Sequence, residues 1–505
     1  MPDAPEPEVQ GSDARTSGEG GQSPAAPEEM STTQWRLRAL SPLDGRYGRQ
    51  MERYAECFSE AALIAERFAV EVAWLEHLAS EPGIEELVPL EDSEAEVLGA
   101  WVDGFGPAEA AKVKQIEATT NHDVKAVEYY LKRRLQDDLG WSAERVEFVH
   151  FAATSEDINN LAYARMVRRA LHEVWLPSAR QLVDEVRAMA LDLAAEPMLA
   201  RTHGQPATPT TMGKELAVFV ARWERQLAQA ATVDIPGKWG GATGALAAHR
   251  IAYPEIDWPE VARRFVEPMG FAWAALTTQI EPHDWMAELF AAMTRFGTIL
   301  IDFCRDMWSY ISLGYLRQRV VEGEVGSSAM PHKVNPIDFE NAEANAGLAS
   351  ALLEHLAQKL PVSRMQRDLS DSSALRNIGS AFGYSGLAVA SARRGLSRVS
   401  ADRAALSRDL DGAWEVLAEA VQTVMRRYGT PGSYEKLKGF SRGKALNADE
   451  LHHFVRGLGL PAHVEQRLST LTPHGYVGFA ERLAKLISSQ PTDRNGPAVG
   501  GKAAP

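Results

Sequence analysis

The amino-acid sequence predicts an all-α protein with long helices in the middle of the chain and shorter helices toward both ends. Apolar residues recur at helical spacing over long stretches, and the period-two alternation of strands is almost absent. Gly- and Pro-containing loops separate the helical stretches. The chain has 505 residues, of which 45% are hydrophobic and 24% charged, so two to four globular domains are expected.

The two ends of the chain differ in composition from everything between them. Residues 1–35 are acidic and rich in Pro, Gly and Ala, and they contain too little apolar surface to fold, so we expect a disordered acidic tail. Residues 489–505 give the same expectation of disorder. Between the tails we expect an N-terminal helical domain over 36–150, a central long-helix bundle domain over 151–395 and a C-terminal helical domain over 396–488.

Helices are predicted in chain order from these patterns. The N-terminal domain should contain a helix over 51–80 and a second helical region over 108–135, interrupted at 119–124. Thr154-Ser-Glu-Asp157 matches a capping box, with Asp in place of the commoner Glu, and predicts a helix to about residue 195 with a bend at Pro177. Another helix should follow the loop at 201–209.

The longest predicted helix runs from about residue 283 to 316. Its apolar residues keep helical spacing over many turns, at Met286, Leu289, Phe290, Met293, Phe296, Leu300, Phe303 and Met307. Such a helix is normally central to a bundle or an oligomer core. We expect a loop after it, a helix over 339–360, irregular structure over 362–375, and shorter helices over 380–427 and 447–488.

Charge and cysteine content limit the classes of function. The net charge of -15 argues against a general binder of nucleic acid or of membrane surfaces. Cys57 and Cys304 lie in apolar helical patterns without metal-ligand spacing, so we expect buried free thiols and a reducing compartment. The sequence has no apolar run of about 18 residues and no secretory or transit signal, so we expect a cytoplasmic protein.

Four polar stretches interrupt the helical pattern, at 119–123, 154–155, 202–205 and 326–336. Each lies at or near a predicted helix end, where unpaired N–H groups and the helix dipole favour anions. His122 and His203 can transfer protons near neutral pH, and Lys333 offers a positive charge for a carboxylate. The sequence contains neither metal-ligand spacing nor a nucleotide-cofactor fingerprint. We therefore expect acid–base chemistry on an anionic substrate without metal or cofactor.

The stretch Gly326-Ser-Ser-Ala-Met-Pro-His-Lys-Val-Asn-Pro336 resembles the signature loop of the fumarase/aspartase superfamily, whose members release fumarate by β-elimination. His332 and the Asp338-Phe-Glu-Asn341 continuation are similar to the branch that cleaves adenylosuccinate. The resemblance extends from about residue 40 to 486 and includes the stretches 120–128, 154–160, 201–208, 278–284 and 367–376. It implies a three-domain helical fold and a homotetramer whose central helices form a shared bundle, with each site assembled from three chains.

The resemblance also implies the reaction and the catalytic residues. Fumarate would be released from adenylosuccinate, giving AMP, and from succinyl-aminoimidazole carboxamide ribotide, both in purine biosynthesis. Ser327 would be the general base and His203 the general acid, with Glu340 orienting His203 and His122 also in the catalytic set. Because serine is a poor base at its ordinary pKa, the loop around Ser327 would have to stabilise the alkoxide as it closes.

Substrate contacts follow from the same resemblance. The succinyl carboxylates would bind Lys333 and Asn335, with Thr154, Ser155 and Gln279 alongside. The phosphate and ribose would bind Arg46, Tyr47, Arg367, Ser372 and Arg376, and the nucleobase and leaving group would lie near His122 and Asp123. The other expected binding residues are Asn121, Ser328, Val334, Asn341, Ser373, Ala374 and Leu375.

Two alternatives remain at this point. One is another fumarate-releasing lyase, such as argininosuccinate lyase, and the other is a catalytically silent scaffolding protein on the same helical bundle. Arg46-Tyr47 and the stretch 367–376 favour a phosphorylated substrate, and the presence of Ser327 and His203 argues against a silent protein. Residues 240–248 replace a stretch that often carries Asn and Tyr in the family, so no substrate contact is assigned there.

Overall fold

The computed structural model describes residues 31–319, 330, 332–441 and 446–488, and the chain divides into two compact units, Met1–Gly48 and Arg49–Pro505. In the first unit, α1 (Thr32–Arg38) begins after Ser31, whose hydroxyl accepts a hydrogen bond from the Gln34 backbone N–H at 3.3 Å. This cap starts a helix inside the predicted N-terminal tail of 1–35. The predicted tail over 489–505 lies outside the described residues, and the three-domain division stays a prediction.

Short and medium helices follow, the first of which, η1 (Gly48–Gln50), includes the boundary between the units. The others are α2 (Glu52–Phe58), α3 (Glu60–Ala79), α4 (Asp92–Asp103), α5 (Pro107–Thr120), α6 (Asp123–Leu139) and η2 (Arg145–Phe148). The helix predicted over 51–80 is two helices, because Ser59 is extended (ψ 162°) and its hydroxyl accepts from the Ala62 N–H at 3.2 Å. Asn121 adopts a left-handed conformation (φ 51°) that ends α5 and allows α6 to start two residues later.

A nearly continuous helix then runs through α7 (Ser155–Arg169), the π-helical turn η3 (Ala170–Trp175) and α8 (Leu176–Asp192). The predicted capping role of Asp157 is confirmed, since its carboxylate accepts a hydrogen bond from the Thr154 N–H at 2.8 Å. Pro177 has no N–H for the Glu173 carbonyl, four residues earlier, and that carbonyl accepts from the Arg53 guanidinium at 3.0 Å instead. The helix has a π turn just before Pro177, and the bend predicted at Pro177 stays a prediction.

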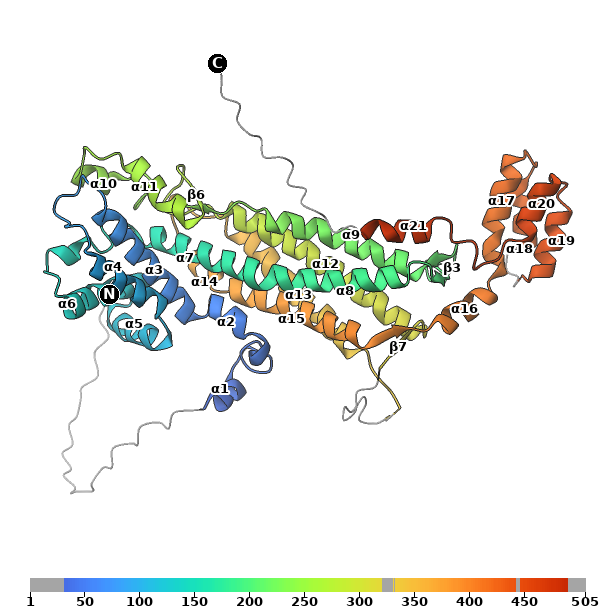
Figure 1. Cartoon of the computed structure of the whole chain (residues 1–505), viewed down its shortest axis with the longest axis horizontal. Coiled ribbons are helices and arrows are strands. Elements are labelled where there is room, and N and C mark those ends of the chain that lie inside the picture. Colours follow the sequence, from blue (N-terminus) through green and yellow to red (C-terminus); the bar gives the residue numbers. More distant parts are fainter. Residues whose placement is uncertain (1–30, 320–329, 331, 442–445, 489–505) are drawn as a thin grey trace, which may run out of the picture. The chain divides into compact units, whose positions relative to one another are not determined.

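The long helices pack into a central bundle. It consists of α8, α9 (Met212–Ala231), α12 (Asp284–Ser312), α13 (Ile337–Lys359) and α15 (Ile378–Ser397), which contact one another side by side (Figure 1). The apolar stripe predicted on α12 is buried, from Met286 to Met307. In the stretch 380–427, where we expected only shorter helices, α15 is a 20-residue helix of the bundle.

Short segments connect the bundle helices. These are α10 (Ala247–Ala252), α11 (Trp258–Val266), η4 (Glu267–Met269) and α14 (Ser370–Leu375). The strands are two or three residues long: β1 (Pro197–Met198), β2 (Arg201–Thr202), β3 (Gln205–Pro206), β4 (Thr210–Thr211), β5 (Pro236–Gly237), β6 (Ala272–Trp273), β7 (Leu316–Gln318) and β8 (Val399–Ala401). Antiparallel pairs form between β1 and β4, β2 and β3, and β7 and β8, whereas β5 and β6 are parallel.

The C-terminal region has a small core of its own. Its elements are α16 (Arg403–Asp411), η5 (Trp414–Leu417), α17 (Ala418–Arg427), α18 (Ser433–Ser441), α19 (Ala448–Arg456), α20 (Ala462–Ser469), α21 (Ala480–Ala484) and η6 (Lys485–Ile487). Apolar residues of α17, α19 and α20, such as Val421, Leu451 and Val464, form a buried cluster, and α21 returns to pack on α9. Cys57 and Cys304 are buried and free, as predicted. In the described ranges, no helix combines the length and apolar character that crossing a membrane requires.

Candidate active site

The predicted site residues of the second unit lie in two clusters at opposite ends of α12. The first cluster surrounds its N-terminus and contains Asn121, His122, Asp123, Thr154, Ser155, Gln279, Arg367 and Ser372–Arg376. The second cluster surrounds its C-terminus and contains His203, Lys333, Val334, Asn335, Glu340 and Asn341. Figure 1 shows α6 and α14 toward one end of the bundle and β3 and β7 toward the other. A helix of 29 residues is roughly 44 Å long.

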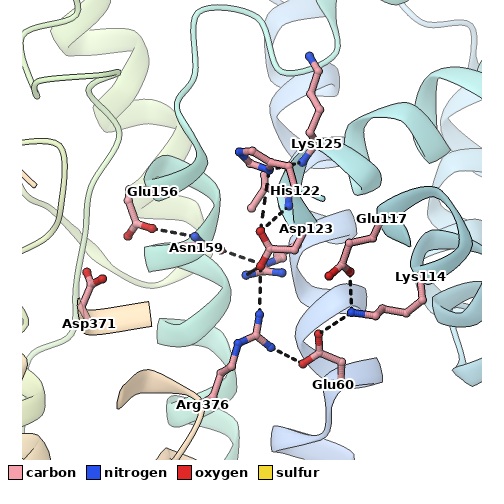
Figure 2. Close-up of polar contacts among 12 residues, drawn as sticks. Glu60, Lys114, Glu117, His122, Asp123, Lys125, Glu156, Asn159, Asp371 and Arg376 are labelled. Atoms are coloured by element: carbon pink, nitrogen blue, oxygen red, sulfur yellow. Dashed lines mark hydrogen bonds and ion pairs between the residues drawn. The ribbon is translucent and has the colours of Figure 1, made fainter. Parts of the chain in front are cut away.

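Asp123 is the centre of a charge network in the first cluster. Its carboxylate lies 2.8 Å from the guanidinium of Arg67 and 3.1 Å from that of Arg376. Figure 2 shows Arg376 between Asp123 and Glu60, with which it forms a second ion pair. Burial alone would raise the pKa of Asp123, but the charges of Arg67 and Arg376 and the Val124 N–H outweigh it, so the pKa is lowered.

His122 lies beside this network and caps α6. Its Nδ1 accepts a hydrogen bond from the Lys125 N–H at 3.1 Å, and about half of the side chain (53%) is exposed. The capping role does not occupy the whole ring, so it is compatible with a position beside a ligand. Asn121 contributes the left-handed residue immediately before it.

Arg367 is the second cation of the first cluster and is held by buried carboxylates. One guanidinium nitrogen lies 2.6 Å from Glu156, and the other lies 3.7 Å from Asp371. Asn159 donates to the same Glu156 oxygen at 2.8 Å. Burial and the charge of Glu156 raise the pKa of Asp371. In the described part of the chain, neither carboxylate oxygen of Asp371 has a hydrogen-bond partner, so this group has unused capacity.

Thr154 and Gln279 are joined through Asp157 and the turn at 240–242, and Ser155 directly follows Thr154. The backbone N–H groups of Gly240 and Gly241 donate to the Asp157 carboxylate, at 2.8 and 3.0 Å. Gln279 donates to the Ala242 carbonyl at 2.9 Å, and its own backbone N–H donates to the Gln366 carbonyl at 3.3 Å. The stretch to which the sequence assigned no contact therefore lies beside three predicted binding residues.

A buried ion pair fixes this turn. Lys238 and Asp157 are both fully buried, with Nζ 2.7 Å from the carboxylate, and Lys238 also donates to the Gly241 carbonyl at 2.9 Å. Asn160 bonds the backbone of Lys238 in both directions. A fully buried charge pair is stable only because each of its two groups also has hydrogen-bond partners.

In the second cluster, His203 lies at the tip of the β2–β3 hairpin. His203 and Gly204 both have positive φ, 55° and 75°, as a two-residue type I′ hairpin turn requires. The pairs Arg201–Pro206 and Thr202–Gln205 form the hairpin. The His203 side chain is exposed, so it can reach a ligand outside its own chain.

The other members of the second cluster lie near the start of α13. Glu340 is exposed and accepts from the Trp308 indole at 3.2 Å, so in its own chain it contacts α12. The Val334 carbonyl accepts from Gln318 at 2.7 Å, and the Asn341 carbonyl accepts from Asn345 at 2.8 Å. Lys333 and His332 are exposed. The predicted base Ser327 and the predicted binding residue Ser328 lie outside the described residues.

The remaining predicted residues are less informative. Arg46 and Tyr47 belong to the first compact unit, where the guanidinium lies 5.8 Å from the neighbouring ring centroid. On α14, the Leu375 side chain is buried, so only its backbone could meet a ligand, whereas Ser372–Ala374 follow the Leu369 turn. No group of three metal-ligating side chains occurs among the residues that the structure describes.

Sequence reasoning missed the charged and polar partners of the predicted site residues. These are the exposed Glu60 and the buried Arg67, Glu156, Asn159 and Asp371, together with the buried His283 just before α12. One signal was present, because Glu156, Asn159 and Asn160 are polar at i, i+3 and i+4 on a helix whose other residues are largely apolar. A polar patch at this spacing on a buried face indicates a polar site.

Comparisons with known proteins identify the family. The family described as Lyase matches residues 45–349, and the family described as adenylosuccinate lyase C-terminal matches residues 363–477. The adenylosuccinate lyase of Haemophilus influenzae is 50% identical over 90% of this chain and 99% of that protein. The adenylosuccinate lyase of Escherichia coli strain K12 is 51% identical over 88% of this chain and 97% of that protein.

Solved structures support the fold. The 3-carboxy-cis,cis-muconate lactonizing enzyme of Pseudomonas putida has a TM-score of 0.68 at 22% identity, covering 86% of this chain and 95% of that chain. A fumarate lyase from Mesorhizobium has a TM-score of 0.69 at 18% identity, covering 86% and 97%. At these identities the likeness concerns the fold alone.

Proposed function

We propose, from the premise that the chain belongs to the adenylosuccinate lyase family, that Ser327 and His203 carry out the two proton transfers of its reaction. The chain is a lyase of purine biosynthesis that eliminates fumarate from adenylosuccinate and so gives AMP. We infer that succinyl-aminoimidazole carboxamide ribotide is cleaved in the same way, because it carries the same succinyl group on nitrogen.

The reaction needs a base, an acid and preorganised donors. Ser327 removes a proton from the carbon next to a carboxylate, and His203 gives a proton to the leaving nitrogen. Negative charge develops on the succinyl carboxylate between these steps, and Lys333 and Asn335, with Thr154, Ser155 and Gln279, stabilise it. Glu340 of another chain orients the His203 imidazole.

The first cluster supplies the nucleotide contacts. Arg367 and Arg376, with Ser372, hold the phosphate and ribose, and Arg46 and Tyr47 add to them. Both clustered arginines are already paired with carboxylates, so the phosphate would share or replace these partners. Bidentate arginine–phosphate contacts suit this exchange. His122 and Asp123 lie beside the nucleobase and leaving group.

The separation of the two clusters is the observation that carries the proposal. No small substrate spans the roughly 44 Å between the ends of a 29-residue helix, so one chain cannot provide a whole site. We infer a homotetramer in which the first cluster of one chain meets second-cluster residues of others. Large apolar residues exposed on the bundle support this inference, namely Val218 on α9, Trp308 on α12 and Leu348 on α13.

Turnover of adenylosuccinate, argininosuccinate and malate by the purified protein tests the proposal. We expect only adenylosuccinate to be consumed, and Ser327→Ala to lower kcat by about 10²- to 10⁴-fold with substrate binding largely kept. Ser309→Ala, on α12, is the matched control, because its hydroxyl donates to the Arg305 carbonyl of its own helix. Full activity of Ser327→Ala would refute the base, and a fully active monomer in light scattering would refute the shared site.

A further inference from the structure

We propose that α16 and α17 of the C-terminal region hold the β2–β3 hairpin in place, and that Asp409 and Tyr315 are positioning residues that act on His203 through Arg201. The inference rests on the proposed function, in which His203 is the acid. It gives the C-terminal region a role in catalysis through contacts that lie within one chain.

The hairpin cannot hold its own position. Each of its strands has two residues, and its register comprises only two residue pairs. An isolated two-stranded hairpin is marginal in water even when it is longer. Because His203 is exposed at the turn, its position depends on what fixes the base of the hairpin.

Arg201 fixes the base of the hairpin through two hydrogen-bonded partners. Its guanidinium lies 2.5 Å from the Asp409 carboxylate of α16 and donates to the Tyr315 hydroxyl at 2.6 Å. The Tyr315 hydroxyl in turn donates to the same Asp409 oxygen. Three side chains from three separate segments therefore close a ring of polar contacts two residues before His203.

The charge states of this ring are stable near neutral pH. Burial alone would raise the pKa of Asp409, but hydrogen bonds from Tyr315 and Arg201 outweigh it and the pKa is lowered. Burial and the Asp409 carboxylate raise the pKa of Tyr315 to about 12, so its hydroxyl remains a donor. The contact is therefore a charged pair with a neutral bridging phenol.

Asp409 is itself anchored to the bundle. Tyr315 directly precedes β7, which pairs with β8 in the register Leu316–Ala401, and its carbonyl accepts from the Asp402 N–H at 2.8 Å. Asp402 caps α16. The end of α12 thus sets the position of α16, and α16 presents Asp409 to the hairpin.

Two further contacts join the hairpin to the same region. Leu199, just before β2, packs with Leu410, Ala413 and Val416 in a buried cluster. After β3, the Thr208 hydroxyl donates to Glu419 of α17, which also accepts from Tyr476 at 3.3 Å. Both flanks of the hairpin are therefore held by the C-terminal region, with the buried contacts on the Arg201 side.

Steady-state kinetics of Asp409→Asn and Tyr315→Phe in the full tetramer-forming chain tests the inference. We expect kcat to fall by about 10- to 100-fold with KM changed less than about twofold, because displacement of the proton donor by about 1 Å has this effect on the rate. Arg403→Gln is the matched control. It lies on the same α16 and pairs with Glu196 and Asp192, away from the ring, so its kcat should be unchanged.

The decisive comparison uses the His203→Asn background. If Asp409 acts through His203, Asp409→Asn lowers kcat in the natural chain and has no further effect in His203→Asn. Equal loss in both backgrounds, or unchanged kcat in folded Asp409→Asn and Tyr315→Phe, would overturn the inference. Tyr315→Phe keeps the Arg201–Asp409 ion pair, so it provides the test if Asp409→Asn does not fold. Full activity of His203→Asn alone would instead refute the proposed acid.

Discussion

The two clusters of the site are built in opposite ways. In the first, Arg67, Glu156 and Asp371 are almost fully buried and form a dense set of ion pairs on helices of the core. In the second, His203, Lys333 and Glu340 are exposed on a hairpin, a loop and the first turn of a helix. The first cluster is preorganised within one chain to bind an anion. In the proposed site, the second cluster acts only on a ligand that another chain holds.

This difference matches the two tasks of the enzyme. A chain with a net charge of -15 must concentrate positive charge locally to bind a phosphate, and in the proposed site ion pairs with carboxylates hold Arg367 and Arg376 in position for it. Proton transfer requires only a few atoms at the correct distance. In the proposed site, binding and catalysis therefore depend on different ends of the bundle, and the predictions below test that division.

The largest effect is expected when one residue of each cluster is substituted in a separate variant. His203→Asn removes the proton donor and should lower kcat by about 10²- to 10⁴-fold with little change in KM. Arg376→Gln removes a phosphate contact and should raise KM instead, by about 10- to 100-fold. Steady-state kinetics on adenylosuccinate gives both values. If both variants lost only kcat, the division between the ends would be wrong.

Activity should return when the His203→Asn and Arg376→Gln proteins are mixed. After mixed tetramers form, some sites take the first cluster from His203→Asn chains and the second from Arg376→Gln chains, so kcat/KM should exceed that of both parents by about 10-fold or more. Arg367→Gln mixed with Arg376→Gln is the control, since both residues lie in one segment of one chain. Recovery in this control, or none in the test mixture, would contradict the shared site.

A smaller effect is expected from the buried pair behind the first cluster. Lys238→Met leaves the fully buried Asp157 without its cation and should cost about 3–5 kcal/mol of the free energy of unfolding. Lys485→Met, whose ion pair with Glu481 is exposed, should cost under about 1 kcal/mol. Urea unfolding followed by tryptophan fluorescence measures both. Adding Asp157→Asn to Lys238→Met should recover part of the loss, and an equal cost for the two lysine variants would argue against the buried pair.

The smallest effect concerns pH. Burial lowers the pKa of His249, beside the Gly241 turn, to about 4. The unfolded chain binds this proton near pH 6.5, so stability falls as the pH drops below 6.5 and levels off near 4. From pH 7.5 to 5 this residue should cost about 2 kcal/mol. His249→Leu should lack this part of the loss, and identical pH dependence in both proteins would refute it.

The ring of Arg201, Tyr315 and Asp409 should respond differently to the same change in pH. The pKa of Asp409 is lowered, and a lowered carboxyl pKa gives stability that is lost only as the pH falls through the folded pKa, so the ring should persist at pH 5. Acid should therefore weaken the packing around His249 before it weakens this ring.

The sequence predicted those features that depend on neighbouring residues. The apolar stripe of α12 and the capping role of Asp157 were visible because helical spacing and caps are local. The break at Ser59 was missed, since a cap inside a long apolar pattern resembles a polar surface position. The fold brings the predicted cation Arg376 to Asp123, whereas Arg367 pairs with Glu156 and Asp371.

The partners of these cations could not be predicted. Glu60 and Arg376 are 316 residues apart, and Arg67 and Asn159 are 92 apart, so no local pattern pairs them. The exposed carboxylate Glu340 was matched to His203 only by resemblance, and within one chain it bonds Trp308. Contacts that need a second chain cannot be read from a single sequence or from a single chain's packing.

The π turn at Ala170–Trp175 determines which insertions and deletions the helix from α7 to α8 can tolerate. Such a turn accommodates one residue more than an α-helix would, and each residue of an α-helix turns its face by about 100°. Loss of one residue there would convert the turn to regular helix with the faces of α7 and α8 nearly unchanged, because the wider π turn absorbs the extra residue. Loss of one residue from α7 or α8 would instead rotate one helix against the other by about 100°, and the two ends of the site would then face different directions.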